Sequence, residues 1–431
     1  MKNLLHKRLF DLEHHQTTVK KELMAGLVGF FTIVYIIAVN SFILAEAGIP
    51  IEGAVLATIL TSFAGCMVMG FWANAPILLV PGMGINALFT YTLVQSMELS
   101  WQEALAVVFV SGIAFTIISF TPLTKMMSNA IPQSLKDSIT IGLGFFLMLI
   151  GLEKGGIVIR GANSIISLGD LSSPKVLATI LTFLIAIILF LRNVKGNFLW
   201  SILIGTVIAA LFGILPEAHS MSFSLSAYGD VFGGMSFDKW TSFPFWVAAF
   251  SITMVLVFEN IGLVHGHTKF MGHPEKFERA FQANGISALL SGLLGSSPTV
   301  STVESSAAIA AGGKTGLTSV TTGILFLTSI LFIPYIKLMP DNAVAPILML
   351  IGGLMVENLR SLDFSDLTEA FPSIFIIAMI PFTYSIADGI AIGFILYPIL
   401  KLSIGKAKEV SAPLYIIAGL FLMNFIFHFI H

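Results

Sequence analysis

The chain has 431 residues, of which 56% are hydrophobic and 11% are charged, and its formal net charge is −2. Its mean hydropathy of +0.93 and its apolar share exceed those of soluble domains, which are roughly 45–50% apolar, and exclude a soluble globular protein. The near-neutral charge gives no indication of nucleic-acid binding. Apolar stretches of about twenty residues recur between short polar breaks, whereas β-barrel strands alternate over about ten residues. We therefore predict an all-α polytopic protein in a lipid bilayer.

Residues 1–21 precede the first long apolar run and include Lys20 and Lys21. They lack a cleavable signal pattern because the apolar run that follows has full spanning length. We expect this segment to stay in the mature protein and to lie in the cytoplasm, and we expect the chain to cross the cell membrane many times.

Hydropathy along the chain predicts fourteen spans. They cover about 22–46, 52–72, 75–97, 103–121, 134–152, 174–191, 197–214, 241–265, 275–294, 296–312, 315–335, 343–357, 365–382 and 385–401. With a cytoplasmic N-terminus, the basic clusters between spans fall inside, and the outer loops 153–173 and 215–240 hold few basic residues, as the positive-inside rule requires. An extra apolar segment, 412–430, is long enough either to span the membrane or to lie along its surface.

Two predicted spans contain helix breakers. Residues 75–97 include Pro81 and Gly82, and the tenth span follows Gly295 and includes Pro298. The breaks lie about half a chain apart, and seven spans per half force the second half to insert upside down. This is the inverted-repeat plan of secondary transporters, in which solutes bind at discontinuous helices. Because irregular backbone at membrane depth needs a protein or water partner, the breaks predict a cavity. The alternative is a pair of kinks without a ligand.

Two carboxylates are predicted at membrane depth, Glu259 in the eighth span and Glu304 just after the tenth-span break. A charge at the bilayer centre costs roughly 2.5–3.5 kcal/mol, so we interpret both as functional. The other acidic residues near spans fall at predicted span ends, where water or headgroups solvate them. These are Glu46, Glu52, Asp137, Glu153, Glu357 and Asp388.

A buried carboxyl can exist protonated or ionised near neutral pH, depending on the side to which its cavity opens, so either glutamate could carry a proton. An ionised carboxylate accepts N–H groups, and backbone amides at a helix N-terminus donate to carbonyl oxygens. The pair suits a flat heterocycle with N–H and C=O groups, as a neutral solute or a cation. Asn86 could offer its amide to the cavity or cap the restarted helix. Phe258 could stack on a ring or pack in the core.

Motifs of soluble enzymes are absent from the sequence. There is no H-E-x-x-H, G-x-S-x-G or P-loop sequence, and GGKTG at Gly312–Gly316 is interpreted as a turn. The single cysteine, Cys66, excludes a disulfide framework and a metal-binding cysteine pair. His265 and His267 lie near the cytoplasmic end of the eighth span, where a role in a loop is favoured over a proton relay. We therefore predict a protein that is not an enzyme and needs no cofactor or metal.

Five motifs together resemble the guanine/hypoxanthine permease branch of the nucleobase-cation symporters, over about residue 10 to the C-terminus. They are VNSFILAEAGIP at Val39–Pro50, VPGMGINALFTYT at Val80–Thr92, FENIG at Phe258–Gly262, SSPTVSTVESSAAIAAGGKTGLTSVTTG at Ser296–Gly323 and PFTYSIADGIAIGFI at Pro381–Ile395. The sequence departs from the family pattern at Glu259, Asn260 and Leu263, and at Pro298, Ala311 and Lys314.

The resemblance implies a core domain of spans 1–4 (22–121) and 8–11 (241–335) and a gate domain of spans 5–7 (134–214) and 12–14 (343–401), with purine bound between them. It implies that Glu259 and Glu304 hold the base, and that Gly84, Asn86 and the backbone near Val303 face it. Transport is expected to be coupled to protons, with either glutamate as the carrier.

The function expected from the sequence is import of purine bases, such as guanine, hypoxanthine or adenine, by proton symport with alternating access. A uracil or xanthine carrier and an anion transporter of the same architecture are the alternatives. A channel and an intramembrane enzyme are disfavoured because the polar residues cluster at two breaks and catalytic sets are missing. A homodimer is left open.

Overall fold

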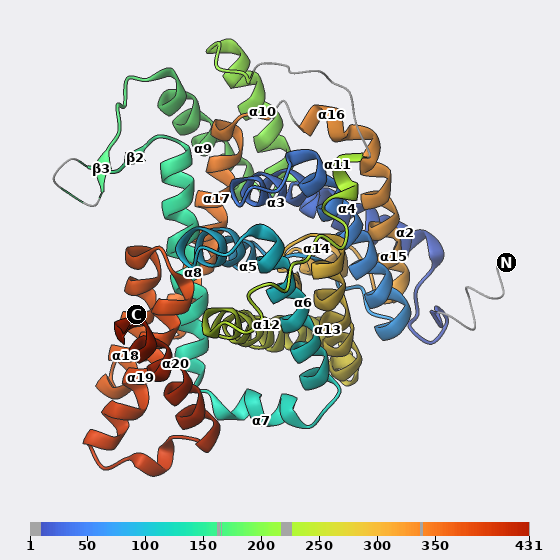
Figure 1. The fold of residues 1–431 in the computed structure, drawn as a ribbon. Helices are drawn as coiled ribbons and strands as arrows, with labels where there is room; N and C mark the ends of the chain where they lie inside the picture. The colour runs from blue at the N-terminus through green and yellow to red at the C-terminus, as the bar shows by residue number, and fades with distance from the viewer. Residues whose placement is uncertain (1–9, 162–163, 165, 217–225, 337–338, 431) are drawn as a thin grey trace.

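A computed structural model describes residues 10–161, 164, 166–216, 226–336 and 339–430 (Figure 1). Residues 1–9 of the predicted N-terminal segment and 217–225 of the predicted outer loop lie outside the described residues. The helices are α2 (Val19–Ile33), α3 (Ile36–Glu46), α4 (Ile51–Val68), η2 (Met69–Ala73), α5 (Met83–Ala87), η3 (Leu88–Ser96), α6 (Trp101–Ser119), α7 (Leu123–Ala130), α8 (Gln133–Lys154), α9 (Pro174–Leu191), α10 (Asn197–Leu211), α11 (Ser226–Gly229), α12 (Phe243–Phe270), η4 (Pro274–Lys276), α13 (Phe277–Leu294), α14 (Ser305–Ala310), α15 (Gly316–Thr328), η5 (Ser329–Phe332), α16 (Ile333–Ile336), α17 (Asp341–Met355), η6 (Val356–Ser361), α18 (Leu367–Thr383), α19 (Ile386–Ser403), η7 (Ala407–Glu409) and α20 (Ala412–Ile430). The strands are β1 (Leu79–Pro81), β2 (Val158–Ile159), β3 (Ser167–Leu168) and β4 (Thr299–Ser301).

Each of the fourteen predicted spans has a counterpart in the described residues. In the part of the chain that the structure describes, eight helical segments are long and apolar enough to cross a membrane, and the seventh, eleventh and thirteenth predicted spans are shorter apolar helices. α13 corresponds to the ninth span, and the third and tenth spans are broken. The predicted polytopic fold of two inverted repeats is therefore confirmed. The extra segment 412–430 forms α20, which packs against α19.

The two broken spans meet each other. The chain is not helical over 74–78 before β1 in the third span and over 295–298 before β4 in the tenth span, and each strand is followed by a short helix, α5 or α14. β1 and β4 pair antiparallel with Leu79 opposite Ser301 and Pro81 opposite Thr299. The pairing gives the irregular backbone hydrogen-bond partners at membrane depth.

Close helix contacts on both sides of these breaks depend on small residues. A Cβ atom added at Gly112 of α6 would lie 2.3 Å from the Leu289 Cα of α13, and one at Gly144 of α8 would lie 2.7 Å from the Gly352 carbonyl oxygen of α17. Small residues bring helix backbones together in this way inside membranes. In Figure 1, α2, α4 and α15 lie on one side of the molecule, and α18, α19 and α20 gather on the other.

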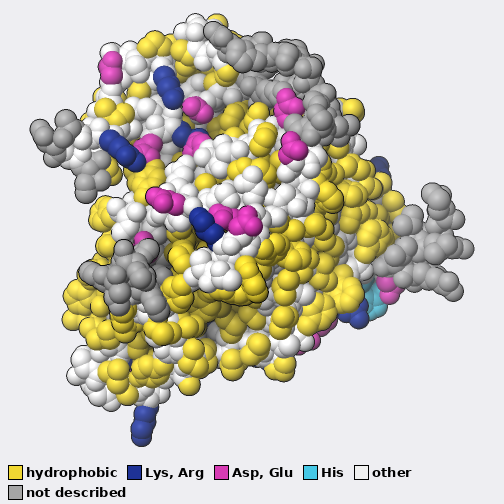
Figure 2. Space-filling model, viewed as in Figure 1, with side chains coloured by type: hydrophobic (Ala, Val, Ile, Leu, Met, Phe, Trp, Pro, Cys, Tyr) yellow, Lys and Arg dark blue, Asp and Glu magenta, His cyan; other side chains and the backbone are white. Residues whose placement is uncertain are grey.

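The surface fits a lipid environment. Figure 2 shows hydrophobic side chains over much of the visible face, while acidic and basic side chains gather toward its upper part. Leucines of the outer helices α9, α10 and η5 are strongly exposed, among them Leu191, Leu211 and Leu331. Exposed apolar side chains carry no cost in the hydrocarbon of a bilayer, whereas they are unfavourable in water.

Candidate functional site

The wall between the broken spans is held by backbone and hydroxyl groups. The Gly82 N–H donates to the Pro298 carbonyl at 3.1 Å, the Thr299 N–H to the Ser291 hydroxyl at 3.1 Å, and the Ser301 N–H to the Asn260 side-chain oxygen at 2.9 Å. These buried hydroxyl and amide groups therefore satisfy backbone freed by the break.

Gly82 allows the two strands to approach. A Cβ atom at this position would lie 2.6 Å from the Val300 Cγ2, and Val300 is fully buried. We expect Gly82→Ala to separate β1 from β4 and to lower stability by about 1–3 kcal/mol, the usual cost of overpacking. Thermal unfolding in detergent and solute uptake both measure this effect. Gly82→Ala combined with Val300→Ala restores the space and should recover part of the stability; no recovery would contradict the steric reason.

A cavity of about 1090 Å³ lies beside this wall. Its lining includes five of the six predicted site residues: Gly84, Phe258, Glu259, Val303 and Glu304. The volume is comparable with that of small-molecule sites, roughly 300–1,000 Å³. The prediction that a cavity forms at the two breaks is therefore confirmed, and both carboxylates line the same cavity.

Glu259 is carried by α12, the long helix that packs against β4. Its Oε2 atom is buried and has no hydrogen-bond partner among the described residues. The next residue, Asn260, points to the protein interior and binds the Ser301 N–H. A buried carboxylate oxygen without a partner is costly, so this atom is a strong candidate to receive a donor from a solute or to carry a proton.

Glu304 stands at the N-cap position of α14. Its Oε1 atom accepts a hydrogen bond of 2.5 Å from the Tyr35 hydroxyl. Tyr35 also lines the cavity. Sequence analysis missed it, because a single tyrosine in an apolar span resembles core packing. The amides of Ser305, Ser306 and Ala307 bond to carbonyls of their own turn, so they are not the solute donors expected from a half-helix N-terminus.

Asn86 differs from its prediction. The helix restarts at Met83 with Gly82 at the N-cap position, so the expectation that Asn86 caps this helix was wrong. The Asn86 side chain is fully buried, does not line the cavity and has no hydrogen-bond partner among the described residues. The geometry therefore does not support a direct solute contact for Asn86 in this conformation.

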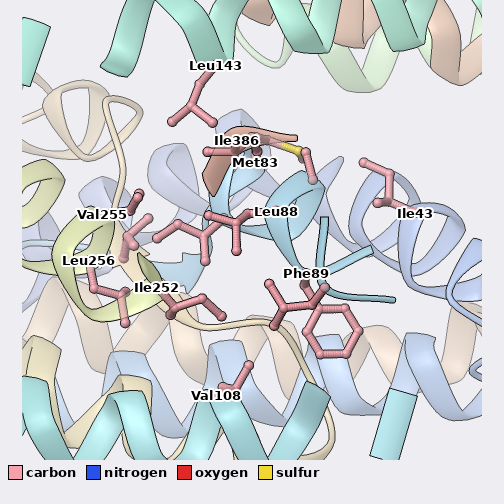
Figure 3. Packing of buried hydrophobic residues seen from close by; sticks show 14 of the residues in the cluster. Ile43, Met83, Leu88, Phe89, Val108, Leu143, Ile252, Val255, Leu256 and Ile386 are labelled. Carbon is pink, nitrogen blue, oxygen red and sulfur yellow. The ribbon is translucent and has the colours of Figure 1, made fainter. Parts of the chain in front are cut away.

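Gly84 lies where α5 approaches α8. A Cβ atom at Gly84 would lie 2.9 Å from the Leu143 Cδ1. In Figure 3, Leu143 projects toward the segment that carries Met83 and Leu88. Both Gly84 and Leu143 line the cavity. The absence of a side chain at Gly84 therefore allows Leu143 to pack directly against the backbone of α5.

The histidines near the end of α12 also correct the sequence interpretation. α12 extends to Phe270, beyond the predicted end at residue 265, so His265 and His267 lie in a helix and not in a loop. His267 is buried, and its Nδ1 lies 2.9 Å from the Ser301 hydroxyl. This contact joins α12, the helix that carries Glu259, to β4.

The cavity reaches the surface at one end of α8. Its mouth is lined by Lys125, Lys136, Asp137, Glu357 and Asn358, and the Lys125 side chain is 84% exposed. Lys136 and Asp137 belong to the first turns of α8, a helix of 22 residues. At 1.5 Å per residue, the two ends of this helix are about 30 Å apart.

The other end of α8 is closed by polar contacts. Lys154 forms an ion pair with Glu46, the Tyr91 hydroxyl donates to Glu46 at 2.7 Å, and the Tyr384 hydroxyl donates to Glu153. Nearby, the Ile386 N–H donates to the Thr92 hydroxyl at 3.1 Å. Glu46 and Glu153 were predicted to be solvated span ends. They are instead paired across neighbouring helices, because the third span and α8 converge at this end.

Comparison with known protein families identifies the family of this chain. The sequence profile of the Permease family (Xan_ur_permease) matches residues 20–392. The chain belongs to this family. As a member of the permease family whose described residues include eight helical segments long enough to cross a membrane, it is a multi-pass membrane transporter and not an enzyme.

Nucleobase transporters of other organisms are similar to this permease over most of its length. It is 50% identical to the nucleobase transporter PlAzg2 of Paenibacillus larvae over 88% of this chain and 76% of the relative. It is 35% identical to the guanine/hypoxanthine permease PbuO of Bacillus subtilis, over 96% of this chain and 99% of the relative. It is also 35% identical to the adenine permease AdeP of Escherichia coli, over 98% and 96%.

Solved structures share the fold of this permease at low identity. The transmembrane domain of the cyanobacterial bicarbonate transporter BicA aligns with a TM-score of 0.63 and 15% identity, covering 85% of this chain and 96% of that domain. The structure of SLC26A9 aligns with a TM-score of 0.66 and 13% identity, covering 94% and 68%. These identities establish the fold alone.

Proposed function

We propose that this permease imports purine nucleobases by proton symport. The observation that carries the proposal is the convergence of Glu259 and Glu304 on one cavity between the two broken spans. Two carboxylates accept N–H groups of a planar heterocycle. Its relatives include a guanine/hypoxanthine permease and an adenine permease, which supports purines as the solute class.

The charge of the cavity argues against the anion transporter alternative. Its inner part holds the two glutamates, whereas the lining lysines, Lys125 and Lys136, stand at the mouth. An anion beside two carboxylates would be repelled unless both were protonated. The fold is shared with a bicarbonate transporter, but function depends on the site and not on the fold.

We propose alternating access between a core (22–121 and 241–335) and a gate (134–214 and 343–401). In support, α6 packs on α13 and α2 on α15 within the proposed core, while α8 packs on α17 and α18 on α19 within the proposed gate. The cavity lies between residues of both parts, such as Glu304 and Leu143. It is open at one end and closed at the other, as one half of such a cycle requires.

We propose that the open mouth faces the cytoplasm of a cell whose plasma membrane holds the permease. Lys125 and Lys136 line that mouth, and basic residues between spans favour the cytoplasmic side. The same orientation places the N-terminus inside. A homodimer stays an open prediction from the sequence.

The test of the solute is a competition panel. Cells that lack their own purine carriers express the permease, and uptake of radiolabelled hypoxanthine is measured against unlabelled guanine, adenine, xanthine and uracil. We expect purines to inhibit more strongly than uracil. Hypoxanthine uptake no higher than in cells without the permease, together with no binding of any purine, would refute the proposed function.

We propose Glu259 as the proton carrier, because its Oε2 lacks a partner among the described residues whereas Glu304 is held by Tyr35. A neutral buried carboxyl avoids the cost of an unpaired charge. In proteoliposomes, Glu259→Gln should lose accumulation driven by a proton gradient but keep exchange of hypoxanthine across the membrane. Accumulation that survives the substitution would contradict this role, and loss of exchange as well would make Glu259 a solute ligand. If a sodium gradient alone drives the wild-type permease, proton coupling is wrong.

A further inference from the structure

Tyr35 lies at the joint between two parts of the first span. α2 ends at Ile33 and α3 begins at Ile36, and the Tyr35 carbonyl accepts from the N–H groups of both Ala38 and Val39 at 3.1 Å. The Tyr35 side chain is only 3% exposed, yet it lines the cavity. The first span is therefore interrupted at Tyr35, and the phenol of this residue lines the cavity. The sequence alone assigned no role to this position.

The hydroxyl of Tyr35 reaches across 269 residues of sequence to the Glu304 Oε1 at 2.5 Å. This distance is typical of a hydrogen bond from a hydroxyl to a charged carboxylate, about 2.5–2.7 Å. Among the described residues, Tyr35 is the hydrogen-bond partner of this carboxylate. Because one oxygen is occupied, the carboxylate is held in one orientation and offers Oε2 to a further donor.

The Tyr35 ring is itself held by aromatic side chains of α9 and α10. It packs edge-on against Phe198 of α10, with ring centroids 4.8 Å apart, and Phe198 stacks on Phe190 of α9. Phe190 lines the cavity as well. Aromatic contacts of this kind hold ring orientation with modest energy. The hydroxyl thus has a defined direction toward Glu304.

We propose that Tyr35 is a positioning residue that orients Glu304 for the solute. The phenol donates to Oε1, keeps that oxygen an acceptor and turns Oε2 toward the N–H group of a bound planar base. The inference deepens the proposed function and rests on it for the identity of the solute. It assigns Tyr35 no contact with the base.

The transport test compares Tyr35→Phe with the wild type, using radiolabelled hypoxanthine as the probe. Phenylalanine keeps the ring on Phe198 and removes only the hydroxyl. A Glu304 carboxylate that is no longer held in one orientation binds the N–H of the base less well, so we expect the half-saturation concentration to rise roughly tenfold, at the low end of the loss of a hydrogen bond to a charged group, with little change in the maximal rate. The matched control is Tyr415→Phe, whose hydroxyl donates to the Ala407 carbonyl and does not line the cavity. Equal half-saturation for Tyr35→Phe and the wild type would overturn the proposal.

A second readout does not depend on transport. Dicyclohexylcarbodiimide modifies protonated carboxyl groups in membrane proteins, and mass spectrometry of the Glu304 peptide measures the extent. The Tyr35 hydroxyl occupies the Glu304 Oε1, so Tyr35→Phe frees this oxygen and should be labelled faster at Glu304 than the wild type, and Tyr415→Phe should not. Unchanged labelling would overturn the positioning role. If hypoxanthine fails as a solute of the wild type, the proposed function fails, while faster labelling of Tyr35→Phe still supports the contact.

Discussion

Glu304→Gln is expected to abolish uptake of hypoxanthine while the protein still reaches the membrane. The amide keeps the size of the side chain but replaces one acceptor oxygen with a donor group that repels the N–H of a base. A hydrogen bond to a charged group contributes about 1.5–3 kcal/mol, so one lost contact alone lowers affinity by roughly tenfold to a hundredfold. Initial uptake rates, normalised to the amount of protein in the membrane, measure the effect.

The control for Glu304→Gln is Glu275→Gln. Glu275 also loses a carboxylate, but its side chain is 67% exposed beside His273 and lies outside the cavity lining. We expect this variant to transport like the wild type. Wild-type rates in Glu304→Gln would remove Glu304 from the proposed site, and a loss in both variants would point to a general effect of charge.

The sequence predicted the parts of the fold that depend on local composition. Long apolar runs located the spans, and Pro81, Gly82, Gly295 and Pro298 located the two breaks, because these residues interrupt helices whatever surrounds them. Glu259 and Glu304 stood out because charge at membrane depth is expensive. Each of these signals lies within a single span, so it was visible without a structure.

Contacts between spans could not be predicted in this way. β1 and β4 are three residues each, too short for an alternating pattern, and their pairing joins distant parts of the chain. Asn86 was interpreted either as a cavity amide or as a helix cap, because asparagine favours the cap position, but strand β1 ends earlier, at Pro81, and Gly82 takes that position. Tyr35 looks like any aromatic residue of an apolar helix until the position of Glu304 is known.

The charged span ends show the same limit. Glu46 and Glu153 were placed at span ends, where water is the default partner. Which charged span ends pair with each other depends on the packing of α3, η3 and α8. This packing cannot be read from the sequence of any one span. The resulting contacts join segments that we assign to the proposed core with segments that we assign to the proposed gate.

Cross-linking Glu46→Cys to Lys154→Cys is expected to abolish transport reversibly. The two native side chains form an ion pair at the closed end of α8, and the Lys154 side chain is only 12% exposed. If the core moves against the gate, this contact must separate when the closed end opens. A bis-methanethiosulfonate reagent bridges the two thiols through cleavable disulfides, so a reductant should restore uptake.

The native protein should not react with the reagent, because its single cysteine, Cys66, is buried. The single variants Glu46→Cys and Lys154→Cys, treated with the same reagent, separate the effect of the bridge from that of modification. Uptake should fall only in the double variant, whereas binding of hypoxanthine to the cross-linked protein should persist, because the mouth lined by Lys125 and Lys136 stays open. Normal uptake by a fully cross-linked permease would mean that this end does not open, and alternating access by movement of core against gate would be wrong.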